Sequence, residues 1–417
     1  MKTFELPNGL RVVLEPMPYM RSVSMGIYVD CGSAYENKLN NGISHFVEHL
    51  LFKGTKNRTA EMISEEADEL GGTLNAYTAE ECVCLYIKVL KNDVKRALDL
   101  LCDVATDPVF DEEAIENEKR VIIEEILSAD DNPEDAAQEM LMSGMLPKHP
   151  IGMPVLGSVE NVESFNKRKL ESFYKVHFVP QNMVLSVAGC FDESEILSLI
   201  NDSPLVRLSK SQTDNNDRGK AEFCSGTFVS QRDIGQLQLV AGFPCVSRYH
   251  DALCSFVLLA GVLAGDGSSR LFRGLREQNG LVYNVDATVA EYRDMGVFLI
   301  NTAFSAENAD EVKRIVSSQI QDVMEHGVDE KELSRAKKSV ITALELETES
   351  TMSQLSANGK AVLFGIDCDV ESLKQKYINV TNEDIISAAR FAFASGKAKA
   401  VALVGDCEGL EDFALIY

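Results

Sequence analysis

Alternating hydrophobic and polar positions predict two similar pairs of strands in this chain. Residues 71–90 alternate like two strands around a short polar turn, and residues 280–304 repeat that plan. A helical spacing of apolar residues follows each pair, from Lys91 to Val104 and from Asn308 onward. The sequence therefore predicts the same succession of strand, strand and helix in both halves.

A second repeated pattern supports an internal duplication. Residues 184–200 and 400–416 each predict a buried strand that turns at a glycine, Gly189 or Gly405, into a helix. In both kinds of repeat, the two copies are separated by nearly the same length of chain. We expect an α+β protein of two duplicated domains, each a largely antiparallel sheet covered by helices.

A polar stretch divides the two halves. Residues 201–222 lack hydrophobic periodicity and contain proline and glycine, as a linker would. We predict an N-terminal domain over residues 1–205, a linker over 206–222 and a C-terminal domain over 223–417. The long helical pattern of residues 111–145 belongs to the first domain in this division.

Composition excludes several classes of protein. The 417 residues are 45% hydrophobic, which is ample for a buried core. A formal net charge of -25 makes nucleic acid and anionic lipid improbable partners, so basic peptides are the expected ones. The longest apolar run, near residues 256–265, is about half of the ~20 residues that a membrane span requires. We expect no membrane span.

The start of the chain and its cysteines indicate a cytoplasmic protein. The N-terminus passes through a Pro-Asn-Gly turn into an alternating strand and has no apolar signal core. The ten cysteines include no Cys-x-x-Cys pair, and we expect them to be reduced and mostly buried. Cys82 and Cys84 share one face of a predicted strand, where core packing is the expected role rather than metal binding.

One short segment carries candidate chemistry. His45, Glu48 and His49 lie in an amphipathic helical pattern that begins near Gly42 and stops at Gly54. Histidines four residues apart share one helical face, so both imidazoles can bind one Zn²⁺. Glu48 shares that face and can accept a proton from the attacking water. The order His-x-x-Glu-His is typical of the inverted zinc-peptidase motif.

A catalytic zinc needs a third protein ligand, and residues 114–128 offer several on another helical pattern. Glu118 and Glu125 are seven residues apart and share nearly one azimuth, whereas Glu124 is rotated by about 100° from Glu125. Charged runs on helices are usually solvated faces. The pattern alone leaves these glutamates open as ligands, and leaves open a pair of core or capping histidines with an incidental glutamate.

Seven segments spread over nearly the whole chain resemble the pitrilysin/insulinase family of zinc metallopeptidases, and most the branch that contains mitochondrial processing peptidase. They are LPNGLRVV, GISHFVEHLLFKGT, LNAYTAEE, IENEKRVIIEEI, HPIGMPVLG, FYKVHFVPQNMVLSVAG and SSRLFRGLREQNGLVY. The resemblance implies a zinc-dependent endopeptidase with one Zn²⁺ per chain. Its substrates would be peptides or unfolded and precursor polypeptides.

The resemblance also implies roles for individual residues. Glu125 would be the third metal ligand beside His45 and His49, and Glu118 would support the site by accepting a hydrogen bond from a ligand imidazole. An edge strand that receives the substrate as an added strand would contain Leu74, Asn75, Ala76 and Tyr77. From the second half, Arg276 and Tyr283 would reach the substrate and the developing oxyanion.

The family relationship leaves two alternatives to a general peptidase. One is an inactive core or assembly subunit of the same fold, and the other is a protease dedicated to maturing one precursor peptide. The chain has about half the length of single-chain relatives with four domains, so we expect a homodimer or a heterodimer with a paralogue. The remaining histidines are expected to be structural or exposed: His149, His177, His250 and His326.

Overall fold

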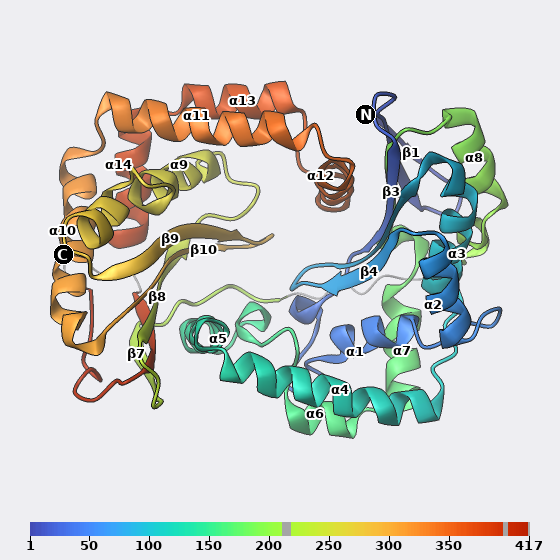
Figure 1. Cartoon of the computed structure of the whole chain (residues 1–417), viewed down its shortest axis with the longest axis horizontal. Coiled ribbons are helices and arrows are strands. Elements are labelled where there is room, and N and C mark those ends of the chain that lie inside the picture. The colour runs from blue at the N-terminus through green and yellow to red at the C-terminus, as the bar shows by residue number, and fades with distance from the viewer. Residues whose placement is uncertain (211–217, 395–398, 416–417) are drawn as a thin grey trace. The chain divides into compact units, whose positions relative to one another are not determined.

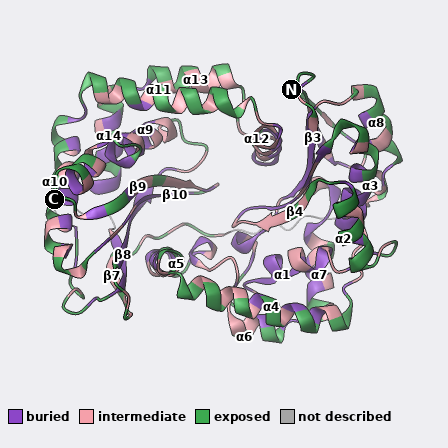
Figure 2. Ribbon diagram, in the orientation of Figure 1, coloured by how far each residue is buried: buried purple, intermediate pink, exposed green. Residues whose placement is uncertain are grey.

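The computed structural model describes residues 1–210, 218–394 and 399–415. They form two compact units, each with its own sheet and buried core (Figures 1 and 2). The first unit comprises Met1–Leu127, Pro154–Arg218 and Leu346–Cys368. The second comprises Ser128–Met153, Gly219–Glu345 and Asp369–Tyr417. The predicted α+β class is confirmed.

The first unit contains a six-stranded sheet in the order β1-β2-β6-β3-β5-β4. Its strands are β1 (Lys2–Glu5), β2 (Arg11–Pro16), β3 (Ser22–Val29), β4 (Thr73–Thr78), β5 (Val83–Leu90) and β6 (Met183–Gly189). Neighbouring strands are antiparallel except β2 and β6, where Val13 lies opposite Ser186 in a parallel pair. The predicted hairpin of residues 71–90 is confirmed, and β4 lies at the edge of the described sheet, paired with β5.

Helices cover both faces of this sheet. The helices of this unit are α1 (Ile43–Leu51), α2 (Ala60–Glu69), α3 (Val94–Thr106), α4 (Glu112–Asp131), α6 (Val159–Ser164), α7 (Lys167–His177), α8 (Glu193–Asp202) and α12 (Thr351–Phe364). Short 3-10 turns are η1 (Ser33–Tyr35), η2 (Lys91–Asp93), η4 (Pro180–Asn182) and η5 (Pro204–Arg207). Apolar residues of α1 and α3, including Val47 and Leu101, share one buried cluster with Met25 and Leu85 of the central strands.

Helix α12 covers the other face of the first sheet, although it comes from the second half of the chain (Figure 1). Leu355 shares a buried cluster with Tyr28 of β3. The hydroxyl oxygens of Ser24 and Thr351 lie 2.9 Å apart. A Cβ at Gly359 would lie only 2.3 Å from the Tyr28 ring, so glycine allows the helix to pack closely on the sheet.

The second unit contains a five-stranded sheet in the order β7-β11-β8-β10-β9. Its strands are β7 (Gly226–Gln231), β8 (Leu237–Cys245), β9 (Val282–Glu291), β10 (Gly296–Phe304) and β11 (Ala400–Gly405). All neighbours are antiparallel except β11 and β7. The helices are α5 (Pro133–Met145), α9 (Leu253–Ala264), α10 (Ala309–His326), α11 (Glu330–Glu347), α13 (Val370–Asn379) and α14 (Asn382–Phe393), with η3 (Pro150–Gly152), the π-helical η6 (Phe272–Glu277) and η7 (Ala306–Asn308).

Each unit takes one helical segment from the opposite half of the chain. Helix α5 packs on the second sheet, where Leu141 and Met145 lie against Gly242 of β8. The predicted division instead placed residues 128–153 with the first domain and residues 346–368 with the second. An amphipathic pattern shows that a helix has an apolar face, but it does not show which sheet that face covers.

The prediction of a helix after β11 is wrong. Residues 406–415 form turns, and Ile416, also part of that prediction, lies outside the described residues. Gly189 and Gly405 end their strands with similar φ angles of 137° and 135°. After β6, Asp192 caps α8 by accepting from Glu195 N–H. In the second repeat Gly409 has a φ of 75°, which interrupts a helix.

The cysteines are free thiols and six of the ten are buried, as predicted. Cys82 and Cys84 lie in the apolar cluster beneath α12. Burial raises the pKa of Cys84, which favours an inert packed thiol over a metal-binding thiolate. Within the described ranges, no helix combines the length and the apolar character needed to cross a membrane.

Candidate metal centre

Helix α1 brings the two motif histidines together. It follows Gly42 and presents His45 and His49 one turn apart on the same side. The two Nε2 atoms lie 3.2 Å from each other. His45 is buried and His49 half-buried, so the pair lies at the edge of the core and not on an open surface.

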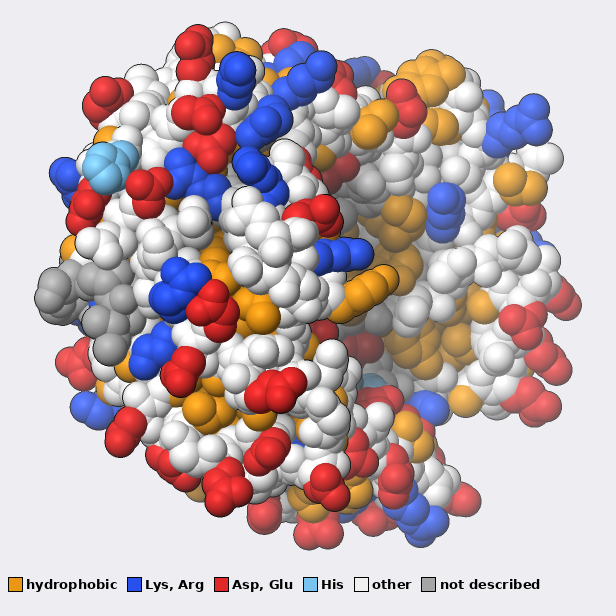
Figure 3. All heavy atoms as spheres, turned by 60° about the vertical axis from the view of Figure 1, so that its left-hand side comes forward, with side chains coloured by type: hydrophobic (Ala, Val, Ile, Leu, Met, Phe, Trp, Pro, Cys, Tyr) orange, Lys and Arg blue, Asp and Glu red, His pale blue; other side chains and the backbone are white. Residues whose placement is uncertain are grey.

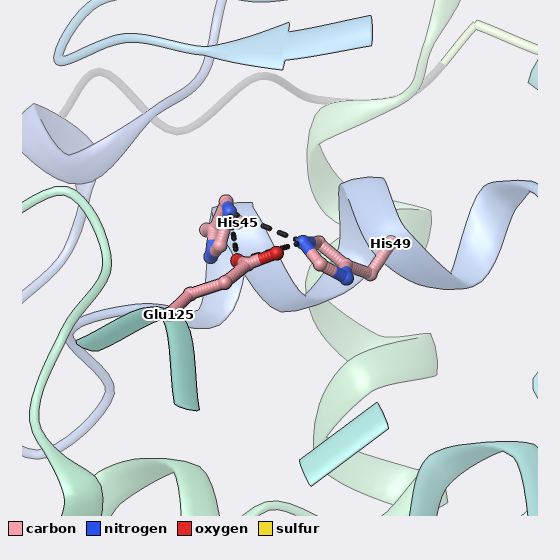
Figure 4. Close-up of side chains that lie close together, drawn as sticks. All are labelled: His45, His49 and Glu125. Atoms are coloured by element: carbon pink, nitrogen blue, oxygen red, sulfur yellow. Dashed lines mark hydrogen bonds and ion pairs between the residues drawn. The ribbon is translucent and has the colours of Figure 1, made fainter. Parts of the chain in front are cut away.

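Helix α4 supplies the third group. Glu125 Oε2 lies 3.6 Å from His45 Nε2 and 3.4 Å from His49 Nε2 (Figure 4). These three residues form the only group of three or more potential metal ligands found in the described ranges. Glu124 is exposed and outside this group. The structure therefore brings together the three residues predicted as ligands.

The separations of these atoms fit a zinc ion. Ligand atoms at about 2.0–2.2 Å from Zn²⁺ in a tetrahedron lie about 3.3–3.6 Å from each other. The observed values of 3.2, 3.4 and 3.6 Å correspond to three corners of such a tetrahedron. Two imidazole nitrogens and one carboxylate oxygen also form a common ligand set for a catalytic zinc with one open position.

The protonation state of His45 suits a metal ligand. Burial, with a smaller contribution from neighbouring His49, lowers the pKa of His45 to about 3. The imidazole is therefore neutral at neutral pH and keeps a lone pair for a metal. Its buried Nδ1 atom has no hydrogen-bond partner in the described part of the chain.

Glu118 lies behind His49, as the family resemblance implied. Its Oε2 atom is 3.0 Å from His49 Nδ1, and its Oε1 atom is 2.8 Å from Lys53 Nζ. The side chain is buried. A carboxylate at Nδ1 favours the tautomer that leaves Nε2 unprotonated, and it fixes the plane of the ring.

Glu48 occupies the same site but is bonded differently. Its Oε2 atom accepts a 2.6 Å hydrogen bond from the Thr78 hydroxyl at the end of β4. Burial raises the pKa of Glu48, the Thr78 bond and His49 oppose the rise, and Glu125 adds to it. A carboxylate with a raised pKa is a stronger proton acceptor, which suits a general base.

The predicted substrate strand is a true sheet edge. The residues predicted to bind substrate lie on β4, which pairs only with β5 among the described strands. They are Leu74, Asn75, Ala76 and Tyr77. Leu74 and Ala76 pack toward the core that contains α1, whereas Tyr77 packs with the cluster beneath α12. An edge strand can pair with a further extended segment.

Arg276 and Tyr283 belong to the second unit. Arg276 lies on η6, and its guanidinium carbon is 4.9 Å from the centre of the Tyr283 ring. Tyr283 is 78% exposed, so its side chain is not part of the core. Between Val282 and Val285, β9 has one more residue than the facing part of β10. This bulge lets both valines stay buried while Tyr283 projects outward.

Lys53 and Thr78 were not predicted as residues of the site. A lysine two residues after a helix gives no local sign of which carboxylate it will meet. Thr78 could have been found from the sequence, because the period of two along β4 places it on the same face as Leu74 and Ala76.

The other histidines have partners away from this site. His149 Nε2 lies 2.8 Å from Asp294, and its Nδ1 accepts from Ile151 N–H. His250 accepts from Ala252 N–H, His326 lies 3.0 Å from Asp322, and the His177 ring packs against Phe173. None of them belongs to the group of potential ligands described above.

Comparison with known families assigns the chain to a class of metallopeptidases. Residues 11–159 match the model described as insulinase (peptidase family M16), and residues 164–340 match the peptidase M16 inactive domain. The chain belongs to peptidase family M16, as the sequence motifs predicted. The three metal-ligand candidates lie in the first matched region, and Arg276 and Tyr283 lie in the second.

Individual relatives agree with this assignment. The chain is 33% identical to an uncharacterized zinc protease of Bacillus subtilis, covering 96% of this chain and 97% of the relative. It is 34% identical to an uncharacterized zinc protease of Mycobacterium leprae, covering 92% and 87%. A solved protease from Helicobacter pylori has a TM-score of 0.91 at 18% identity, over 97% of this chain and 99% of that chain. A peptidase M16 inactive domain from Pseudomonas fluorescens has a TM-score of 0.89 at 16% identity, over 97% of both chains.

Proposed function

We propose that this chain is a zinc-dependent endopeptidase that hydrolyses peptide bonds in peptides or in unfolded and precursor polypeptides. The convergence of His45, His49 and Glu125 at zinc-site separations, with Glu48 beside them, carries the proposal. One Zn²⁺ per chain, when bound, lowers the pKa of a water toward about 7 and polarises the scissile carbonyl.

Glu48 is the proposed general base. It accepts a proton from the attacking water and passes the proton to the leaving amine as the peptide bond breaks. The hydrogen bond from Thr78 engages one carboxylate oxygen and fixes the orientation of the group. Because Thr78 ends β4, the same contact links the base to the proposed substrate strand.

An extended substrate would bind by pairing with β4. Backbone groups on the free edge give affinity that is independent of sequence, and side chains of the substrate alternate between the two faces. The proposed contacts are those of Leu74, Asn75, Ala76 and Tyr77. This mode favours unfolded segments, since most strands of a folded substrate are already paired on both sides.

The second unit would contribute Arg276 and Tyr283. The Tyr283 hydroxyl would donate to the developing oxyanion, and Arg276 would position the substrate. Arg276 and Tyr283 contact each other, and the Tyr283 side chain is exposed, so it is accessible to a substrate.

Basic peptides are the proposed preferred substrates. The net charge is -25, and acidic side chains are spread over the face shown in Figure 3. Lysine- and arginine-rich peptides should therefore have a higher kcat/KM than neutral peptides at low salt, and added salt should remove that advantage. Equal kcat/KM values for both peptides at low salt would refute the preference.

The proposed assembly is a homodimer, or a heterodimer with a paralogue, in which two chains of two domains close a chamber. Light scattering of the purified protein tests the homodimer directly, and copurification of a second chain tests the heterodimer. A strict monomer that remains active at assay concentration would contradict both.

Metal content and peptide turnover measured on one preparation test the enzymatic function. We expect about one zinc per chain and hydrolysis that stops with a chelator and returns with zinc. A zinc-free protein without turnover would favour an inactive assembly subunit. An unbiased peptide library would then separate broad peptide cleavage from dedicated maturation of one precursor.

A further inference from the structure

The amino end of α1 cannot carry a capping side chain of its own. Gly42 occupies the N-cap position with a φ of 95°, and it makes no side-chain cap hydrogen bond. A Cβ at this position would lie 2.7 Å from Leu156 O and 2.8 Å from Gly157 Cα. The serine, threonine or aspartate that usually caps a helix is therefore excluded here, and the first amides of α1 need other acceptors.

Glu36 supplies two of these acceptors from outside the helix. Its Oε2 atom accepts from Gly42 N–H at 2.7 Å, and its Oε1 atom accepts from Ser44 N–H at 2.7 Å. The Asn41 side-chain amide also donates to Oε2, at 3.0 Å. Hydrogen bonds to an ionised acceptor are stronger than neutral ones, so one carboxylate fixes several points of the first turn.

The burial of Glu36 requires an explanation beyond ordinary packing. The residue is 4% exposed, and no ion pair to it occurs among the described residues. Burial raises the pKa of Glu36, while the bonds from Ser44, Gly42 and Asn41 oppose the rise. A buried carboxylate without a cation is costly unless amide donors and the positive end of a helix stabilise it. At this position the donors are Ser44 N–H in the first turn of α1, N–H of the N-cap Gly42, and the side-chain amide of Asn41 just before the helix that carries His45 and His49.

We propose that Glu36 is a positioning residue of the metal centre, holding the first turn of α1 so that His45 Nε2 stays at its ligand position. Ser44, whose amide Glu36 binds, directly precedes His45. Glu118 orients the His49 ring, but His45 Nδ1 has no such partner in the described chain, so its position depends on the backbone. This inference rests on the proposed zinc site.

The test compares Glu36→Gln with the unmodified protein. The NH2 group of the glutamine side chain would face one of the two backbone N–H groups. Two donors cannot bond to each other, so that backbone N–H loses its acceptor. In zinc-free protein we expect faster hydrogen exchange of the peptide over residues 37–52 and unchanged exchange of β5. We also expect a zinc Kd, measured by chelator competition, that is about tenfold higher.

Asp192→Ala is the matched control. Asp192 is also a carboxylate cap, accepting from Glu195 N–H, but its helix α8 carries no candidate ligand. Its loss should lower the Tm without changing the zinc Kd. Glu36→Asp is the second variant, because it keeps the charge but is too short to reach both amides. It should give an intermediate zinc Kd. If Glu36→Gln does not fold, the zinc Kd of Glu36→Asp tests the role of Glu36.

Several results would overturn the inference. An unchanged zinc Kd in Glu36→Gln would do so even if α1 exchanges faster, because Glu36 would then be a purely structural cap. A wild-type zinc Kd in Glu36→Asp would do so if the glutamine variant fails to fold. If the unmodified protein binds no zinc, the proposed function fails together with this inference. If the unmodified protein binds zinc and the variants do so equally well, only the role of Glu36 fails.

Discussion

His49 Nδ1 lies 3.0 Å from Glu118 Oε2, and the other nitrogen of the same ring, Nε2, lies 3.4 Å from Glu125 Oε2. Lys53 Nζ lies 2.8 Å from the other oxygen of Glu118. The buried carboxylate thus connects a cation to the ligand ring. This arrangement favours one tautomer of His49 and one orientation of its ring.

Glu118→Gln should weaken zinc binding without removing a ligand. The glutamine amide cannot accept hydrogen bonds from both His49 Nδ1–H and Lys53 Nζ as strongly as the carboxylate does. The zinc Kd should therefore rise about 10–100-fold. Lys53→Met should produce a smaller rise. Glu116→Gln is the control, because Glu116 is exposed on the same helix and, among the residues that the structure describes, pairs with Lys119 and not with the site. A wild-type zinc Kd in Glu118→Gln would refute this role.

Glu125→Gln should reduce zinc occupancy directly, since it replaces an anionic ligand with a poor neutral one. Glu124→Gln provides a neighbouring control on the same helix, because that side chain is exposed and outside the ligand group. Metal analysis after dialysis distinguishes the two. Full zinc occupancy in Glu125→Gln, or loss of zinc in Glu124→Gln, would show that Glu125 is not the third ligand.

Helical periodicity predicted the parts of the site that depend on spacing within one helix. Four residues separate His45 from His49, and seven separate Glu118 from Glu125, so each pair faces one side. Which of these glutamates is the ligand did not follow from periodicity. The family resemblance supplied that assignment, and the structure brings Glu125 to both Nε2 atoms.

Features that depend on packing between distant segments were not predicted. One such feature is that α5 packs in the second unit and α12 in the first. The hydrophobic patterns of these two helices are compatible with either sheet. The cap that Glu36 provides is another, since the loop between Glu36 and Gly42 must fold before the carboxylate can meet the helix. The outward direction of Tyr283 depends on a bulge in β9, which strand alternation alone does not reveal.

Tyr283→Phe should lower kcat while leaving the Tm and zinc content unchanged. The side chain is 78% exposed, so losing its hydroxyl has little effect on folding. Removal of one oxyanion donor costs ~10²–10³-fold, and a loss nearer ~10-fold is expected where a metal shares the charge. Arg276→Ala should also raise KM, because substrate positioning weakens. A folded Tyr283→Phe enzyme with wild-type kcat and KM would exclude this tyrosine from the active site.

Asp286→Asn should stabilise the second unit at neutral and alkaline pH. Burial, with a further contribution from Glu134, raises the pKa of Asp286, while a bond from Asn301 opposes the rise. An acid with a raised folded-state pKa destabilises the fold when ionised, and this cost disappears as pH falls through that pKa. The variant should melt about 1–2 °C higher at pH 8, with the difference shrinking toward about pH 4. A difference independent of pH would contradict this assignment.

The most direct test of the account is Glu48→Gln, with zinc content and peptide turnover measured on the same preparation. The amide preserves the helix and all three ligand candidates but cannot accept a proton from water. We expect zinc content equal to that of the unmodified protein and a loss of kcat by at least about 10³-fold, within the range typical of a general base. Turnover within a few-fold of the unmodified enzyme, with zinc fully bound, would contradict the central claim that Glu48 activates the attacking water.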